Sequence, residues 1–168
     1  MATFVHLTSE KNISSIKRTG IKTTIKGENG YPNGFFSQAV TPNFYISHQW
    51  LRELKRKGQK TLCGIYFRIP DNENVWVGHY NKNHVLTTAA NAIRIIQNNE
   101  SFLGYQVYIP RKVEKKEIIK IKYLPQNIGW RYYPEAHGKK PCGCPICIPN
   151  GEIKSRKIRQ QWELEMNQ

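Results

Sequence analysis

The residues best suited to chemistry come from three separate stretches of the chain. His6 and Thr8 end the first apolar run, Ser47 precedes Trp50 by three residues, and Gln106 is a polar residue within a late apolar run. An imidazole and a hydroxyl at the end of a strand lie where loops meet, and binding sites are commonly built there. The ordinary alternatives are a core histidine bonded to a backbone carbonyl, a core tryptophan, and a strand glutamine without a special role.

A second cluster consists of thiols. Three cysteines lie within six residues of one another, separated by glycine and proline: Cys142, Cys144 and Cys147. Zinc is held by four nitrogen or sulfur ligands in a tetrahedron, so three close thiolates can surround one ion. His137 is the nearest candidate for the fourth ligand, with Cys63 or His84 as alternatives. We expect a structural zinc site, and reduced structural thiols or redox chemistry remain the alternatives.

The chain is strongly basic. Twenty-six Lys and Arg face twelve Asp and Glu, a net charge of +14, and from Arg111 onward thirteen basic residues face six acidic ones. This charge favours a nucleic acid, RNA or DNA, because neutralising each phosphate releases counterions. An acidic protein, a membrane surface and a merely solvated surface are the alternatives. The candidate contacts are Arg111, Lys112, Arg131, Tyr132, Lys154, Arg156, Lys157 and Arg159.

The sequence also bounds the compartment. No apolar run approaches the length of about 18 residues that a membrane-spanning helix needs. The first residues lack the basic-then-apolar pattern of a signal peptide. We therefore expect no membrane partner and a cytoplasmic protein, in which cysteines stay reduced or bind metal.

The elements that must position these residues are read from periodicity and from turn and capping residues. Strands are predicted at 3–7, 35–46 with a break near Pro42, 61–69, 75–77, 103–109 and 117–123. Helices are predicted at 9–18, 47–57, 86–98 and 152–166, the first two capped by Ser9 and Ser47. Few β-helix-β alternations occur, which favours an α+β fold over a doubly wound sheet.

In order and spacing, these segments resemble the ADP-ribosyltransferase superfamily, on the side of diphtheria toxin and poly(ADP-ribose) polymerase, and its DarT-type toxins that modify nucleic acid. The motifs that carry the resemblance are Phe4-Val5-His6-Leu7-Thr8 before a helix, Gly34-Phe35-Phe36-Ser37 followed by Ser47-x-x-Trp50, and Leu103 to Pro110 before the strand at Glu117. The resemblance implies a single-domain split mixed β-sheet with flanking helices. Residues 3–123 would form the NAD-binding core, with NAD in a cleft, and 124–168 a basic, cysteine-rich extension.

The resemblance also implies roles. The positions that would hold NAD are His6, Thr8, Phe36, Ser47 and Trp50. Of these, Ser47 would bind the nicotinamide amide and Trp50 would stack on its ring. His6 and position 106 would be catalytic. The implied reaction moves ADP-ribose from NAD to an RNA or DNA base and releases nicotinamide. A bacterial or phage-defence toxin, with an antitoxin protein as a further partner, follows from the resemblance only.

Position 106 departs from the family, whose third motif usually supplies a glutamate. An amide keeps the shape and the hydrogen bonding of a carboxylate but lacks the charge that stabilises an oxocarbenium-like transition state. Three explanations are open: Glu100 approaches the site instead, the protein is a binder or weak enzyme, or Gln106 is an inactivating replacement of Glu. Two other functional classes also remain: a non-catalytic zinc-containing nucleic-acid-binding module, and an RNA-processing nuclease with His6 and His84 as general acid and base.

Overall fold

The computed structural model describes residues 1–27, 31–42, 47–56, 62–99, 103–124 and 156–167. Its strands are β1 Ala2–Ser9, β2 Phe35–Ala39, β3 Leu62–Ile69, β4 Asn74–His79, β5 Val85–Thr88, β6 Tyr105–Ile109 and β7 Ile118–Tyr123. Its α-helices are α1 Ile13–Thr19, α3 Leu51–Arg56, α4 Ala89–Gln97 and α5 Arg156–Met166, and two 3₁₀ turns are η1 Glu10–Asn12 and η2 Lys115–Glu117. The mixture of one sheet with a few helices confirms the α+β prediction.

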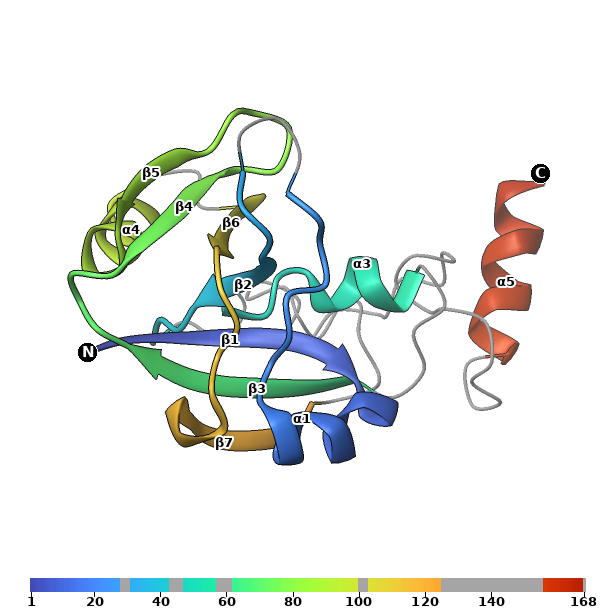
Figure 1. Cartoon of the computed structure of the whole chain (residues 1–168). Helices are drawn as coiled ribbons and strands as arrows, with labels where there is room; N and C mark the ends of the chain where they lie inside the picture. The colour runs from blue at the N-terminus through green and yellow to red at the C-terminus, as the bar shows by residue number, and fades with distance from the viewer. Residues whose placement is uncertain (28–30, 43–46, 57–61, 100–102, 125–155, 168) are drawn as a thin grey trace.

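The seven strands form one sheet in the order β5-β4-β6-β2-β1-β3-β7. Every pairing between these strands is antiparallel, so the expectation of a mixed sheet is wrong. β1 and β2 are sheet neighbours joined by a segment that contains α1, and even they pair antiparallel, so this connection does not form the crossover that parallel neighbours need. β1 and β2 join through only two residue pairs, whereas β1 and β3 join through eight. Figure 1 shows β1, β3 and β7 together and β4, β5 and β6 as a second group at an angle to them.

The core fills the space where these two groups of strands face one another. It contains Phe4 of β1 and Phe67 of β3 from one group, Val107 of β6 from the other, and Phe35 of β2, the strand between them. Ile13 and Ile16 of α1 and the apolar side of α4 cover it. A smaller cluster on the other face joins α3 to the sheet through Leu51, Leu62 and Leu124.

Several element boundaries differ from the sequence prediction because polar side chains have other partners. Ser9 is the last residue of β1 and makes no capping hydrogen bond. Ser47 does not cap α3, which begins at Leu51, because its hydroxyl bonds the backbone of Thr41. The predicted helix at 86–98 begins only at 89, because 85–88 pair with β4 and Thr88 is the true N-cap.

Candidate functional site

The divergence of β1 from β2 leaves room for an imidazole. Beyond the pair Val5↔Gln38 the two strands no longer pair, and His6 Nδ1 lies 2.8 Å from the carbonyl oxygen of Phe36. A carbonyl only accepts hydrogen bonds, so His6 carries its proton on Nδ1 and presents Nε2 as an acceptor. The ring is also held edge-on by Phe35, with centroids 5.1 Å apart. One nitrogen of His6 is therefore bonded to a backbone carbonyl, as in the ordinary interpretation of this residue. The other nitrogen is left for a ligand.

The His6 imidazole stays neutral near pH 7. Part of the side chain reaches the surface, yet burial lowers the pKa of His6, and the hydrogen bond with Phe36 opposes this in part. A neutral imidazole keeps a lone pair on Nε2. Among the described residues, Nε2 of His6 has no hydrogen-bond partner. It can accept a hydrogen bond from a hydroxyl.

Phe36 supplies the carbonyl that His6 contacts, and its side chain, on the face of β2 opposite Phe35, presents an aromatic surface. Its side chain is 38% exposed although it belongs to a central strand. Its ring contacts Tyr108, its partner on β6, at 5.1 Å between centroids, and His84 at 5.9 Å. A partly exposed ring held by two neighbours is suited to stacking on a flat ligand.

Gln106 and His84 form the polar part of this face. Gln106 Nε2 lies 3.2 Å from His84 Nε2, so the amide donates and His84 accepts, with its own proton on Nδ1. Burial lowers the pKa of His84, which agrees with a neutral ring. The backbone N–H of His84 donates to the Tyr31 hydroxyl at 3.0 Å. Gly78, the partner of Gln106 on β4, makes this approach possible, because a Cβ there would lie 3.0 Å from the His84 Cα.

Trp50 contacts Tyr105, the residue of β6 that precedes Gln106. Its indole Nε1 donates to the carbonyl of Tyr105 at 3.2 Å, and its ring meets Tyr80 edge-on with centroids 5.5 Å apart. Tyr80 is 58% exposed and follows β4, whose Gly78 pairs with Gln106. Trp50 and Tyr80 therefore lie near the start of β6, the strand that carries Gln106.

The structure brings together some of the predicted site residues and not others. Contacts link His6 through Phe36 and His84 to Gln106, and Trp50 reaches the same strand through Tyr105. Thr8 is buried and its hydroxyl accepts from Asn12, and Ser47 is buried with its hydroxyl on Thr41. Both hydroxyls therefore have protein partners where the sequence placed ligand contacts. Glu100 lies outside the described residues.

The sequence interpretation missed Gln38. This side chain is only 5% exposed, and it makes no hydrogen bond with any described residue. It lies on the Phe36 face of β2, and continuing the pairing beyond Ser37↔Val107 brings it level with Gln106. A buried amide without a partner is costly unless a ligand satisfies it. Only the pairing of β2 reveals this feature, since a glutamine in a strand carries no signal of burial.

We expect Gln38→Leu to hold or gain stability while losing ligand binding. The leucine removes the penalty for a buried amide without a partner, so the free energy of unfolding should stay level or rise by about 1 kcal/mol. Ser37→Ala is the matched control, because the Ser37 hydroxyl donates to the Val107 carbonyl at 3.2 Å. That control should lose about 1 kcal/mol and, if the implied NAD site exists, leave the affinity for NAD unchanged. Thermal unfolding and calorimetric titration with NAD measure both; a destabilised Gln38→Leu that binds NAD normally would make Gln38 a structural residue.

The pKa of His84 gives a second readout of the site. In the natural pair, His84 Nε2 accepts a bond from Gln106, which favours the neutral ring. Gln106→Glu would place an accepting carboxylate there, so His84 must donate and its pKa should rise by about one unit or more. The titration of the imidazole signals by NMR measures this change. Gln97→Glu, on an exposed residue of α4, adds the same charge elsewhere and should leave the pKa of His84 unchanged. If His84 titrated identically in both variants, it would not interact with the side chain at position 106.

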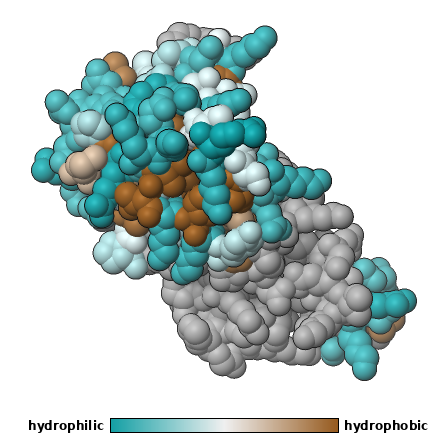
Figure 2. All heavy atoms as spheres, turned by 60° about the horizontal axis from the view of Figure 1, so that its bottom comes forward, coloured by the Kyte–Doolittle hydropathy of each residue, from teal (hydrophilic) through white to brown (hydrophobic). Residues whose placement is uncertain are grey.

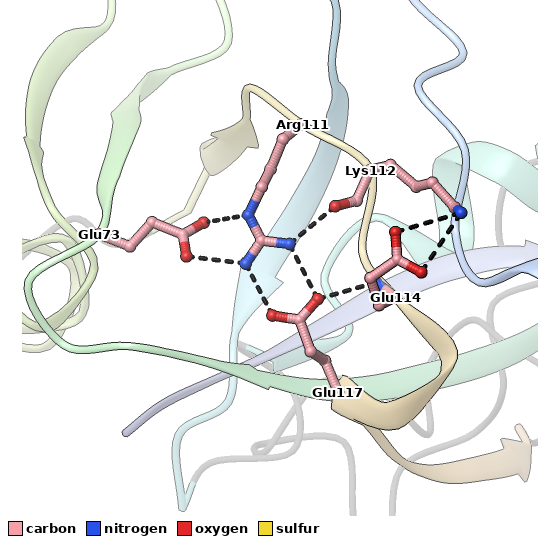
Figure 3. Close-up of polar contacts among 5 residues, drawn as sticks. All are labelled: Glu73, Arg111, Lys112, Glu114 and Glu117. Carbon is pink, nitrogen blue, oxygen red and sulfur yellow. Dashed lines mark hydrogen bonds and ion pairs between the residues drawn. The ribbon is translucent and has the colours of Figure 1, made fainter.

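The basic candidates fall into different environments. The guanidinium of Arg111 uses all five of its N–H donors, on both carboxylate oxygens of Glu73, both of Glu117 and the Lys112 carbonyl (Figure 3). This bonding ties the residue before β4, the segment after β6 and η2 together, and it leaves the guanidinium no free N–H for the predicted phosphate contact. Lys112 is exposed and pairs with Glu114 at 3.2 Å.

The remaining predicted positions lie largely beyond the described part of the chain. Arg156 and Lys157 are exposed on α5, and Arg159 belongs to the same helix. The positions outside the described residues are Arg131, Tyr132, Lys154, His137, Cys142, Cys144 and Cys147. Of the alternative zinc ligands, Cys63 is buried in the core and His84 bonds Gln106. Within the described ranges, no group of three or more metal-ligating side chains occurs.

Comparison with known proteins adds no relative: no protein-family model, curated protein or solved structure matches the chain. None of the helices in the described residues is long and apolar enough to cross a membrane.

Proposed function

We propose that the chain belongs with the enzymes that transfer ADP-ribose from NAD to a base of RNA or DNA. The observation that carries the proposal is the linked set His6–Phe36–His84–Gln106. Residues from β1, β2, the segment before β5 and β6 are in contact there, and three of them, His6, Phe36 and Gln106, belong to the motifs that carry the resemblance.

The available groups fit such a dinucleotide. Nε2 of His6 would accept a hydrogen bond from a ribose hydroxyl, and the exposed ring of Phe36 would stack on a base or on nicotinamide. The buried amide of Gln38 would form a hydrogen bond with a polar group of the ligand. Trp50 would bound the same face beside Tyr80. In this proposal, Ser47 and Thr8 support the site through their bonds to Thr41 and Asn12.

The proposed step is a substitution at the anomeric carbon of the nicotinamide ribose. The bond from this carbon to the nicotinamide nitrogen breaks, and nicotinamide leaves with the bonding electrons. A nitrogen or oxygen of the acceptor base forms the new bond and gives up its proton to solvent or to a basic side chain. The side chain at position 106 faces the positive charge that develops on the ribose.

The test is incubation of the full chain with NAD labelled in its adenylate group and with single-stranded and duplex RNA and DNA. Transfer of label to a nucleic acid, together with an equal release of nicotinamide, supports the proposal. Release of nicotinamide without an acceptor would reduce it to NAD hydrolysis.

An RNA-processing nuclease is the second candidate, because His6 and His84 both contact Phe36 and both have lowered pKa values. His6 contacts the Phe36 carbonyl and His84 contacts the Phe36 ring, and neutral imidazoles are suited to general base chemistry. Strand cleavage in the absence of NAD, lost in His6→Ala, would favour this candidate. A cytoplasmic toxin restrained by an antitoxin, and a structural zinc in residues 137–147, complete the main proposal.

A further inference from the structure

Basic side chains gather where two distant segments lie side by side. One segment is the end of α1 with the residues after it, and the other surrounds η2. We call the exposed cations of these two segments the basic face: Lys17, Arg18, Lys22, Lys112, Lys115 and Lys116.

The backbone fixes the two segments against each other. Ile21 and Val113 exchange two backbone hydrogen bonds, of 2.9 Å and 3.0 Å, and both side chains are buried. Gly20 has φ +80°, and a Cβ there would lie 2.0 Å from the Val113 carbonyl oxygen and 3.1 Å from the Lys115 nitrogen. The end of α1 therefore lies directly on the residues that lead into η2. Cations about 95 positions apart in the chain are thus held on one surface.

The charge of the basic face is largely uncompensated. Of its six cations, only Lys112 forms an ion pair within the described residues, with Glu114. Glu73 and Glu117, two further carboxylates of this region, are bonded by Arg111, and the charge of Lys116 also lowers the pKa of Glu117 after the larger effect of Arg111. Lys120 and Lys122 are also exposed and extend the positive charge along β7. Keeping this many like charges together is unfavourable for the isolated fold, which points to an anionic partner.

We propose that the basic face docks the phosphate backbone of a nucleic acid. A row of exposed lysines suits a regularly charged polymer, because each contact releases a counterion without demanding one fixed geometry. Insertion of α1 into a bilayer is disfavoured, since its apolar residues Ile13 and Ile16 are already buried in the core. Seen from the side of α1 and β7, hydrophilic side chains dominate the described surface around one apolar area (Figure 2).

This docking surface differs from the one expected from the sequence, and of the predicted contacts only Lys112 belongs to it. The surface would present the strand whose base is modified under the proposed function. Binding of a nucleic acid to this surface requires no NAD. The docking proposal and the transferase proposal can therefore be refuted independently.

The test is fluorescence anisotropy of a labelled 20-nucleotide single strand and of its duplex, with the full chain, at salt concentrations from about 50 to 200 mM. We expect tight binding at low salt and a linear fall of log K with log salt. Lys115→Gln with Lys116→Gln should reduce the magnitude of that slope by about 1.5 to 2, because two phosphate contacts are lost. The control pair, Lys82→Gln with Arg94→Gln, removes the same charge from exposed positions on the β4–β5 turn and α4.

The outcomes are distinct. A reduced slope in the first pair and an unchanged slope in the control pair support the docking surface. If both double variants showed the same slope of log K against log salt, net charge alone would drive binding. That result would overturn the assignment of the basic face as the docking surface. Vesicles of phosphatidylserine and phosphatidylcholine provide the remaining arm, because of the apolar area on this side. Binding to these vesicles with no binding to either oligonucleotide would replace the nucleic acid by a membrane surface.

Discussion

Gln106→Glu is expected to raise the rate of ADP-ribose transfer by about a hundredfold or more, which corresponds to about 2.7 kcal/mol of transition-state stabilisation. The ribose gains positive charge as nicotinamide leaves, and a carboxylate stabilises this charge where a neutral amide does not. The measurement is the initial rate of label transfer to nucleic acid, with nicotinamide release followed in parallel.

The structure contains a group that makes this substitution tolerable. Gln106 is half-buried, so a new carboxylate there would be costly without a partner. His84 lies at hydrogen-bond distance and is neutral, so it can take up a proton and turn from acceptor to donor. We therefore expect Gln106→Glu to fold with nearly the stability of the natural chain at neutral pH. In the double variant with His84→Ala, the unpaired carboxylate should lower stability by about 1–3 kcal/mol.

Two controls make the activity result specific. Gln97→Glu adds the same charge on an exposed position of α4 and should leave the rate unchanged. Adding His6→Ala to Gln106→Glu should remove most of the gained activity, because the acceptor at Nε2 is lost. An inert Gln106→Glu that binds NAD as the natural chain does would contradict the catalytic assignment of position 106. If all variants except those at His6 cleaved the strand without NAD, the result would reject the transferase and favour the RNA-processing nuclease.

Much of the sheet was predictable from the sequence because buried strands show as apolar runs. The runs at 3–7, 61–69 and 103–109 correspond to β1, β3 and β6 within one or two residues. The hydroxyl residues misled the prediction at the ends of elements. Thr88, Ser47 and Ser9 have similar local propensities, and only Thr88 accepts a capping bond, from the Asn91 N–H. Which hydroxyl caps a helix depends on competing partners such as Thr41, six residues before Ser47, and local propensity does not choose between them.

The contacts among the candidate site residues were not predictable from the sequence. The motif resemblance named His6, Phe36 and Gln106 as candidates, but the hydrogen bond between His6 and Phe36 exists because β1 and β2 stop pairing. The approach of His84 depends on the missing side chain of Gly78. These are properties of strand pairing, which a single sequence does not specify.

Charge was the least reliable guide to position. Arg111 was expected on the surface because it begins the basic third of the chain. Its guanidinium instead lies between two carboxylates whose side chains are only 20% and 17% exposed, Glu73 and Glu117. Sequence gives the number of charges, and folding decides which of them neutralise one another.

Arg111→Ala is expected to destabilise the fold by about 2–4 kcal/mol. The substitution removes five hydrogen bonds and leaves two largely buried carboxylates facing each other. Partial exposure of Arg111, at 34%, keeps the expected loss below that of a fully buried network. For a domain of this length, the midpoint of thermal unfolding should fall by about 5–10 °C. Arg111→Lys should recover less than half of the loss, since an ammonium has only three N–H donors on one atom and cannot form two parallel bonds to each carboxylate.

The pH dependence identifies the cause of this loss. The Arg111 hydrogen bonds, opposed in part by burial, lower the pKa of Glu117 from its ordinary value of 4.5. The stabilisation is therefore complete above about pH 4.5 and declines as the pH falls toward the lowered pKa, because the unfolded chain takes up the proton first. The gap in unfolding free energy between the natural chain and Arg111→Ala should narrow over that acidic range. Lys112→Gln, which breaks only the exposed pair with Glu114, should change stability by less than about 0.5 kcal/mol at any pH. A gap that stays constant down to pH 3 would show that lost packing, and not the carboxylate bonds, weakens the variant.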